Sequence, residues 1–257
     1  MILGLSGNDD DEVFWCYEKA LQIMNSFLTK SLSINDAVNQ KHLQDMTCMI
    51  MSYYAVSFAS SDMYDDAISM FDEALDNFSC SVENESFILH RRAEAQLVSG
   101  DFYKAGMDIA RLYKFNRDFF LSMALSSLTR LVHGNADAFP GGWKSILEII
   151  NYELSLAEQM IPQLHSNSSR QNIEVFARRL QKLHYALFFY NEQHLNNTDK
   201  AWYHLEESQK FKAIYTKTIP DVETTNFETN RLTFTPNLMN ALEGVGSETR
   251  VPIFIVG

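Results

Sequence analysis

Length, composition and charge set the first limits on this chain. Its 257 residues suffice for one large helical domain or two smaller ones, and the 10 glycines and 5 prolines are too few for a turn-rich β-sandwich. A net charge of −12 disfavours nucleic acid and anionic membrane surfaces as partners, because both repel an acidic surface.

Apolar residues recur at helical spacing from the N-terminus onward. Acidic residues followed by an apolar stripe predict a first helix over about 10–30, with the aspartates at its positive end. A break at 31–35 separates it from a second helix. In chain order, further helices are expected over about 36–59, 117–132, 143–160, 170–193 and the AWYHLEESQKF stretch.

Two segments in the first half share a helix–turn–helix pattern. Each has a small residue in its first helix, a short turn, and then an alanine, a bulky and a small or apolar residue at helical spacing. Alanines let two antiparallel helices approach, and the bulky residues fill the space between neighbouring pairs. The residues are Ala55, Phe58, Tyr64, Ala67, Phe71 and Ala74 in the first unit, and Ala93, Leu97, Gly100, Asp101, Phe102, Ala105, Ile109 and Leu112 in the second.

This pattern resembles the tetratricopeptide repeat. The corresponding alanines Ala67 and Ala105 lie 38 residues apart, whereas the family period is about 34, and a longer loop at about 80–84 would account for the excess. A third, divergent unit is expected over about 183–216. The alternative is a generic bundle of helical hairpins.

The amino-acid composition changes after Pro220. Residues 220–250 are polar and threonine-rich, with one short helix expected at FTPNLMNAL. The final VPIFIVG has the apolar, β-branched pattern of a buried parallel strand. A lone buried strand would leave its backbone groups unpaired, so we expect this sequence to be cut from a longer chain.

The predicted fold class is all-α, a right-handed tetratricopeptide-like array of antiparallel helix pairs that ends in a linker and one orphan strand. The predicted organisation is N-terminal capping helices at 1–40, the repeat region at 41–219, the linker at 220–250 and the strand of a truncated α/β domain at 251–257.

The order of features after about residue 183 is similar to that of tetratricopeptide-containing sulfotransferases. The landmarks are LHYAL, DKAWYHLEESQKFK, FTPNLMNALEGVGS and the terminal VPIFIVG. In that family this strand opens the sulfotransferase domain and leads into a phosphate loop that holds phosphoadenosine phosphosulfate. The resemblance therefore implies that Gly257 starts a truncated cofactor-binding loop.

The same resemblance implies that this chain alone is inactive. The basic, serine and threonine residues of the loop and the family's catalytic base would lie beyond Gly257, so no catalytic residue can be assigned and no cofactor is expected here. The parent protein would be a sulfotransferase that uses 3′-phosphoadenosine 5′-phosphosulfate.

A groove is the expected place for a partner. In repeat arrays the first helices line the concave surface, where a peptide or a segment of an acceptor protein could bind. The residues expected to face it are Met49, Ser52, Val56, Phe87, His90 and Glu94. No metal site is expected, because His184, His194 and His204 are spaced ten apart, unlike metal ligands on one helix face.

The cysteines and the N-terminal sequence indicate in which cellular compartment the protein is expected. No apolar run reaches the roughly 18 residues of a membrane span, and the N-terminus lacks the basic segment of a signal peptide. We therefore expect a cytoplasmic protein in which Cys16, Cys48 and Cys80 are free thiols, their even spacing being chance or repeat-related packing.

Four Asn-x-Ser/Thr sequons are interpreted as ordinary surface asparagines, unless an unrecognised signal directs the chain to secretion. They begin at Asn77, Asn84, Asn167 and Asn196.

Three functional hypotheses follow. The leading one is the N-terminal repeat region of a sulfotransferase, which positions an acceptor substrate or a partner protein. The alternatives are a free-standing scaffold for protein–protein interaction and a repeat region fused to another phosphate-loop enzyme. An Arg-Ser-Gly loop after residue 257 would support the first, a stop codon the second, and a Gly-Lys-Ser/Thr loop the third.

Overall fold

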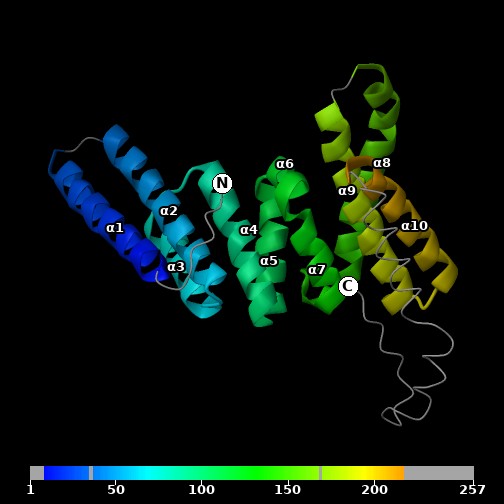
Figure 1. The fold of residues 1–257 in the computed structure, drawn as a ribbon, viewed down its shortest axis with the longest axis horizontal. Coiled ribbons are helices and arrows are strands. Elements are labelled where there is room, and N and C mark those ends of the chain that lie inside the picture. Colours follow the sequence, from blue (N-terminus) through cyan, green and yellow to red (C-terminus); the bar gives the residue numbers. More distant parts are fainter. Residues whose placement is uncertain (1–8, 35–36, 168–169, 217–257) are drawn as a thin grey trace, which may run out of the picture. The chain divides into compact units, whose positions relative to one another are not determined.

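The regular structure in the described part of the chain is entirely helical (Figure 1). The computed structural model describes residues 9–34, 37–167 and 170–216. The all-α class is confirmed for these residues. The expected linker at 220–250, the strand at 251–257 and Gly257 lie outside them.

The α-helices are interrupted by short π- and 3₁₀-helical segments. They are, in chain order, α1 (Asp9–Ile34), α2 (Ala37–Ser60), α3 (Tyr64–Asn77), α4 (Val82–Ser99), α5 (Phe102–Phe115), α6 (Arg117–Phe119), η1 (Phe120–Ala124), α7 (Leu125–Asn135), η2 (Ala136–Ala138), α8 (Gly142–Asn167), α9 (Arg170–Phe189), η3 (Tyr190–His194) and α10 (Thr198–Tyr215).

The first predicted helix pair corresponds to α2 and α3, which pack against each other. Ala55 of α2 and Ala67, Phe71 and Ala74 of α3 are completely buried in one core cluster. The small residues allow the two helices to approach, and the Phe71 ring fills the space between them. The boundary expected after residue 40 falls inside α2, so residues on both sides belong to one helix.

The second predicted pair is α4 and α5, joined by a tight turn. Gly100 ends α4 with a positive φ of 86°, a conformation that costs glycine little because it has no Cβ. The Asp101 carboxylate then accepts a hydrogen bond from the Lys104 amide and caps α5. Phe102 follows and packs against Gly134 of α7, where a side chain would meet the phenyl ring.

Two segments depart from regular α-helix. The helix expected at about 117–132 runs from α6 to α7 but contains the π-helical η1, and the expected 170–193 helix ends in the π-helical η3. A π segment inserts one residue into a helix and is found frequently at functional sites. No periodicity in the sequence distinguishes these segments from α-helix.

The prediction of free thiols is wrong for two of the three cysteines. Cys48 of α2 and Cys80, between α3 and α4, form a disulfide with a Cα–Cα distance of 5.7 Å, whereas Cys16 is free and exposed. The chain after α3 returns to α2, where the Asp45 carboxylate accepts hydrogen bonds from the Ser81 amide at 2.6 Å and the Asn84 side chain at 2.7 Å. These contacts place residue 80 opposite residue 48.

None of the helices in the described ranges is both long and apolar enough to cross a membrane.

Candidate binding site

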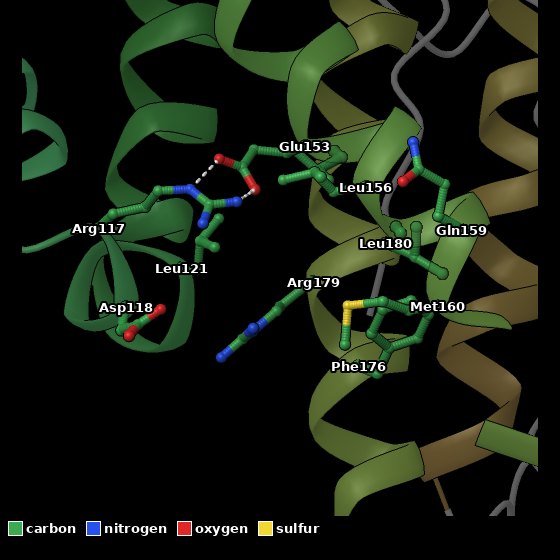
Figure 2. Close-up of a pocket in the computed structure, with 12 residues that line it drawn as sticks. Arg117, Asp118, Leu121, Glu153, Leu156, Gln159, Met160, Phe176, Arg179 and Leu180 are labelled. Carbon is green, nitrogen blue, oxygen red and sulfur yellow. Dashed lines mark hydrogen bonds and ion pairs between the residues drawn. The ribbon is translucent and has the colours of Figure 1, made fainter. Parts of the chain in front are cut away.

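A cavity of about 350 Å³ lies between the α6–η1 segment, α8 and α9 (Figure 2). α8 contributes residues 153, 156, 157, 159 and 160, and α9 contributes residues 176, 179, 180 and 183. Each set has the spacing of one helix face, so two amphipathic stripes form the walls. The lining residues are Arg117, Asp118, Leu121, Glu153, Leu156, Ala157, Gln159, Met160, Phe176, Arg179, Leu180 and Leu183.

The carboxylate of Glu153 is fully engaged at one side of this cavity. Arg117 donates from Nε at 2.7 Å and from a terminal nitrogen at 2.6 Å, and the Tyr113 hydroxyl donates at 3.1 Å. Only 5% of Glu153 is exposed. The hydrogen bonds to Glu153 raise the pKa of Arg117, so the guanidinium stays charged and fixes α6 to α8. We infer a positioning role for Glu153, because both carboxylate oxygens already accept hydrogen bonds from side chains of neighbouring elements.

Arg179 has no such partner among the described residues. Its side chain extends from α9 toward the α6–η1 segment, on the side where Asp118 lies and away from Met160 and Phe176 in this view (Figure 2). Its Nε is buried and makes no hydrogen bond, and no ion pair to it occurs among the described residues. An arginine presents five donors in a fork that matches a carboxylate or another planar anion. A buried donor without a partner costs about 1–3 kcal/mol.

The helix that carries Arg179 is locally basic although the whole chain is acidic. Arg178 precedes it, with its guanidinium 4.6 Å from the centre of the Tyr215 ring, and Lys182 follows one turn later. Burial and the nearby charge of Arg178 lower the pKa of Lys182. Three cationic side chains, Arg178, Arg179 and Lys182, therefore lie within five residues of α9.

The predicted groove residues do not share one open face. Val56 and Glu94 line a second cavity of about 220 Å³, together with Arg91 and Arg130. The Glu94 carboxylate forms an ion pair with the Arg91 guanidinium, at 2.9 Å between Oε2 and a terminal nitrogen, so the charge of Glu94 is compensated locally.

Two other groove residues are buried. The Ser52 hydroxyl donates to the Cys48 carbonyl at 2.6 Å within α2. His90 is 3% exposed, with Nδ1 3.4 Å from the Ser127 hydroxyl and Nε2 3.7 Å from Glu94, and burial lowers its pKa. Both side chains therefore serve packing between helices in this structure.

Met49 and Phe87 complete the predicted groove set. Met49 is exposed on α2, whereas Phe87 is partly covered by the ring of Tyr53, at 5.6 Å between centroids, and by the guanidinium of Arg91. The six residues are thus divided between an exposed surface, a small cavity and the interior.

The structure brings together two of the three histidines that are spaced ten apart. The Nδ1 atoms of His184 in α9 and His204 in α10 lie 3.1 Å apart, so one neutral ring donates to the other. Burial and the neighbouring His204 lower the pKa of His184 to about 4. His194 instead stacks with Trp143 and Tyr190. In the described ranges no group of three His, Cys, Asp or Glu side chains suited to a metal ion occurs.

Sequence reasoning did not identify the cavity around Arg179. The signal is present in retrospect, because Glu153 and Arg179 each interrupt an otherwise apolar stripe on a long helix. A charged residue at a core-facing position requires either a partner or a ligand. Only the structure shows that Glu153 has the first and Arg179 lacks it.

Comparison with protein-family models, curated proteins and solved structures found no match to this chain.

Proposed function

We propose that this helical region is a binding module that holds an acidic segment of a partner or acceptor protein in the cavity around Arg179. One observation carries the proposal: a guanidinium with an unsatisfied buried Nε extends into a cavity of about 350 Å³ that has largely apolar walls. A site of this size accommodates one or two side chains of a peptide segment.

The lining defines the chemistry of the ligand. Arg179 supplies a bidentate site for a carboxylate, and Met160, Phe176 and Leu180 supply contact area for an apolar neighbour. A segment in which Asp or Glu alternates with a large apolar residue fits both. Because the chain has a net charge of −12, its overall charge repels an acidic partner, so binding depends on the direct contact with Arg179.

The cavity is suited to binding rather than to acid–base chemistry. Its one buried carboxylate, Glu153, is held by three hydrogen bonds, and its free cation is an arginine, which does not lose its proton near neutral pH. This supports a module that positions a ligand for chemistry performed elsewhere.

The place of such a module follows from the sequence resemblance. We propose that it is the N-terminal tetratricopeptide-like region of a sulfotransferase that uses 3′-phosphoadenosine 5′-phosphosulfate, and that the acidic segment belongs to the acceptor. The DKAWYHLEESQKFK landmark forms most of α10, which packs against α9 beside the cavity-forming face, and this arrangement suits the proposal.

Two experiments test the two parts of the proposal separately. Reading the gene past codon 257 tests the enzyme: a Pro-Arg-Ser-Gly-Thr loop entering a helix is expected. A stop codon would instead indicate a free-standing scaffold, and a Gly-Lys-Ser/Thr loop would indicate another phosphate-loop enzyme.

Panning the purified chain against a random peptide pool tests the module. Enrichment of alternating acidic and apolar residues is expected, and enrichment of basic peptides would contradict it.

A further inference from the structure

The disulfide is the first of two independent features that bear on where this protein folds. Cys48 is completely buried in the core formed by α2 and α3, and Cys80 is held beside it by the return of the chain to α2. Joining the two thiols removes two protons and two electrons, which pass to the disulfide of an exchange partner and convert it to a dithiol. Stable disulfides of this kind persist in oxidising compartments and are rare in the cytosol.

The second feature is the accessibility of the sequon at Asn196. Asn196 lies in the connection between η3 and α10, has a positive φ of 49°, and is exposed. Its side chain makes no hydrogen bond to the described part of the chain, whereas its neighbour Asn197 accepts one from the Lys200 amide and caps α10. The amide of Asn196 is therefore presented to solvent at a turn, which suits attack on an external donor.

The sequon at Asn77 is presented in a similar way. Asn77 is the last residue of α3, is exposed, and is followed by extended backbone at Phe78 and an exposed Ser79. The helix ends there, so the three residues of the sequon are not locked into one helical turn.

The sequon at Asn84, in contrast, is inaccessible. The side chain of Asn84 donates to the Asp45 carboxylate at 2.7 Å and to the Asp45 carbonyl at 3.3 Å. These bonds fix the start of α4 against α2, and a glycan on this nitrogen would displace them. The structure thus separates two open sequons from one that serves packing.

We infer that this protein folds in an oxidising lumenal compartment and carries N-linked glycans at Asn77 and Asn196. At each site the amide nitrogen forms a bond to C1 of a lipid-diphosphate-linked oligosaccharide. The bond from C1 to the diphosphate oxygen breaks, the lipid diphosphate leaves with the electron pair, and the amide proton goes to a base of the transferase. This inference departs from the cytoplasmic location expected from the N-terminal sequence, and it does not depend on the proposed binding module.

The test uses protein purified from its own source cells without reducing agent. An amidase that removes N-linked glycans converts each glycosylated asparagine to aspartate, and in heavy-oxygen water the conversion is labelled for mass spectrometry. Labelled aspartate is expected at positions 77 and 196, with position 84 unchanged. Conversion at neither 77 nor 196, or conversion at 84, would overturn the assignment of sites.

The same sample tests the compartment through its thiols. Iodoacetamide under denaturing, non-reducing conditions is expected to label Cys16 and to leave Cys48 and Cys80 unmodified. Labelling of Cys48 and Cys80 would overturn the oxidising compartment.

Paired substitutions separate the sequon from any effect on folding. Thr198→Ala removes the sequon at Asn196 and is expected to abolish that glycan, whereas Thr198→Ser retains both the hydroxyl and the glycan. Ser79→Ala and Ser79→Thr form the corresponding pair for Asn77. Equal glycan occupancy in the two members of a pair would contradict the inference for that site.

Discussion

The α2–α5 region and the α8–α10 region differ in how their helices pack. In α2–α5 the interhelical contacts are made by completely buried alanines and aromatic or aliphatic residues, and a disulfide connects α2 to the chain after α3. In α8–α10 the long helices line a cavity with an unsatisfied arginine nitrogen, and a pair of partly buried histidines joins α9 to α10. Close packing maximises stability, whereas cavities and unsatisfied polar groups lower it. Buried unsatisfied atoms also occur in the first region, at Arg91 Nε and Gln96 Oε1, so the second region is distinguished by the larger cavity that Arg179 lines, and this is where we place the proposed binding site.

The largest expected effect concerns the disulfide of the α2–α5 region. Replacing Cys48 and Cys80 with alanine removes a cross-link that closes a loop of 32 residues, which the chain-entropy model values at about 3–4 kcal/mol of unfolding free energy. The measurement is a denaturant titration of the double variant beside the wild type, with Cys16→Ala as the control. A double variant as stable as Cys16→Ala would show that this region does not depend on its cross-link.

The next effect concerns the Arg117–Glu153 pair between the two regions. Arg117→Met leaves the buried carboxylate of Glu153 with Tyr113 as its remaining partner. The loss of unfolding free energy should be about 3 kcal/mol, at the low end for a broken buried pair because Arg117 is partly exposed.

A double variant sharpens the interpretation of that loss. In Arg117→Met/Glu153→Leu the uncompensated charge is gone, so much of the stability should return. If the double variant is less stable than Arg117→Met, the penalty does not come from the unpaired carboxylate.

The histidine pair should make the stability of the α9–α10 contact depend on pH. Burial and His204 lower the pKa of His184 to about 4, below its ordinary value of about 6.5. The unfolded state therefore binds more protons in this interval, and stability that is complete above pH 6.5 is lost as the pH falls toward 4. We expect a loss of roughly 1–2 kcal/mol, reduced from the full linkage value because the pair is partly exposed.

A variant without the titrating ring isolates this effect from the carboxylates. His184→Phe retains a ring that can stack on Phe211, and its unfolding free energy should fall less steeply between pH 6.5 and 4.5 than that of the wild type. Glu207 and Lys200 also act on the pair, with opposite signs, and both remain in the variant. If the unfolding free energy depends on pH equally in the two proteins, the histidine pair is not a pH-sensitive contact.

The smallest expected effect is a gain in stability. Arg179→Met removes the buried unsatisfied Nε while retaining an unbranched side chain, so the unfolding free energy should rise by about 0.5–1 kcal/mol. Thermal unfolding of the ligand-free protein measures it. A destabilised variant would mean that Arg179 contributes to the fold rather than to binding.

The sequence predicted the helices well because their signal is local. Apolar residues at helical spacing, scarce prolines and a glycine at position 100 locate most of the helices and the turn between α4 and α5. The helix ends were less accurate: α1 extends through Ile34, where a break was expected, and α8 extends well past Met160. Ends depend on tertiary packing and on capping, which the sequence pattern reports weakly.

The features missed all depend on distance between separate elements. Nothing in the spacing of Cys48 and Cys80 shows that the chain after α3 returns to α2. Likewise, the contact between His184 and His204 arises because α9 and α10 pack as neighbours. The role of Arg179 depends on an absence of partners, and that can be judged only when the surrounding side chains are placed.

The most direct test of the central claim is whether a ligand carboxylate meets Arg179. Fluorescence anisotropy measures the binding of two peptides: an acidic, apolar peptide from the panned pool, and the same peptide with glutamine in place of glutamate. Each peptide is titrated with the wild type, with Arg179→Met and with the control Arg178→Met. We predict that Arg179→Met weakens binding of the acidic peptide at least about tenfold and that of the glutamine form much less, while Arg178→Met changes either little. Equal losses for both peptides, or equal losses in the two variants, would contradict the account.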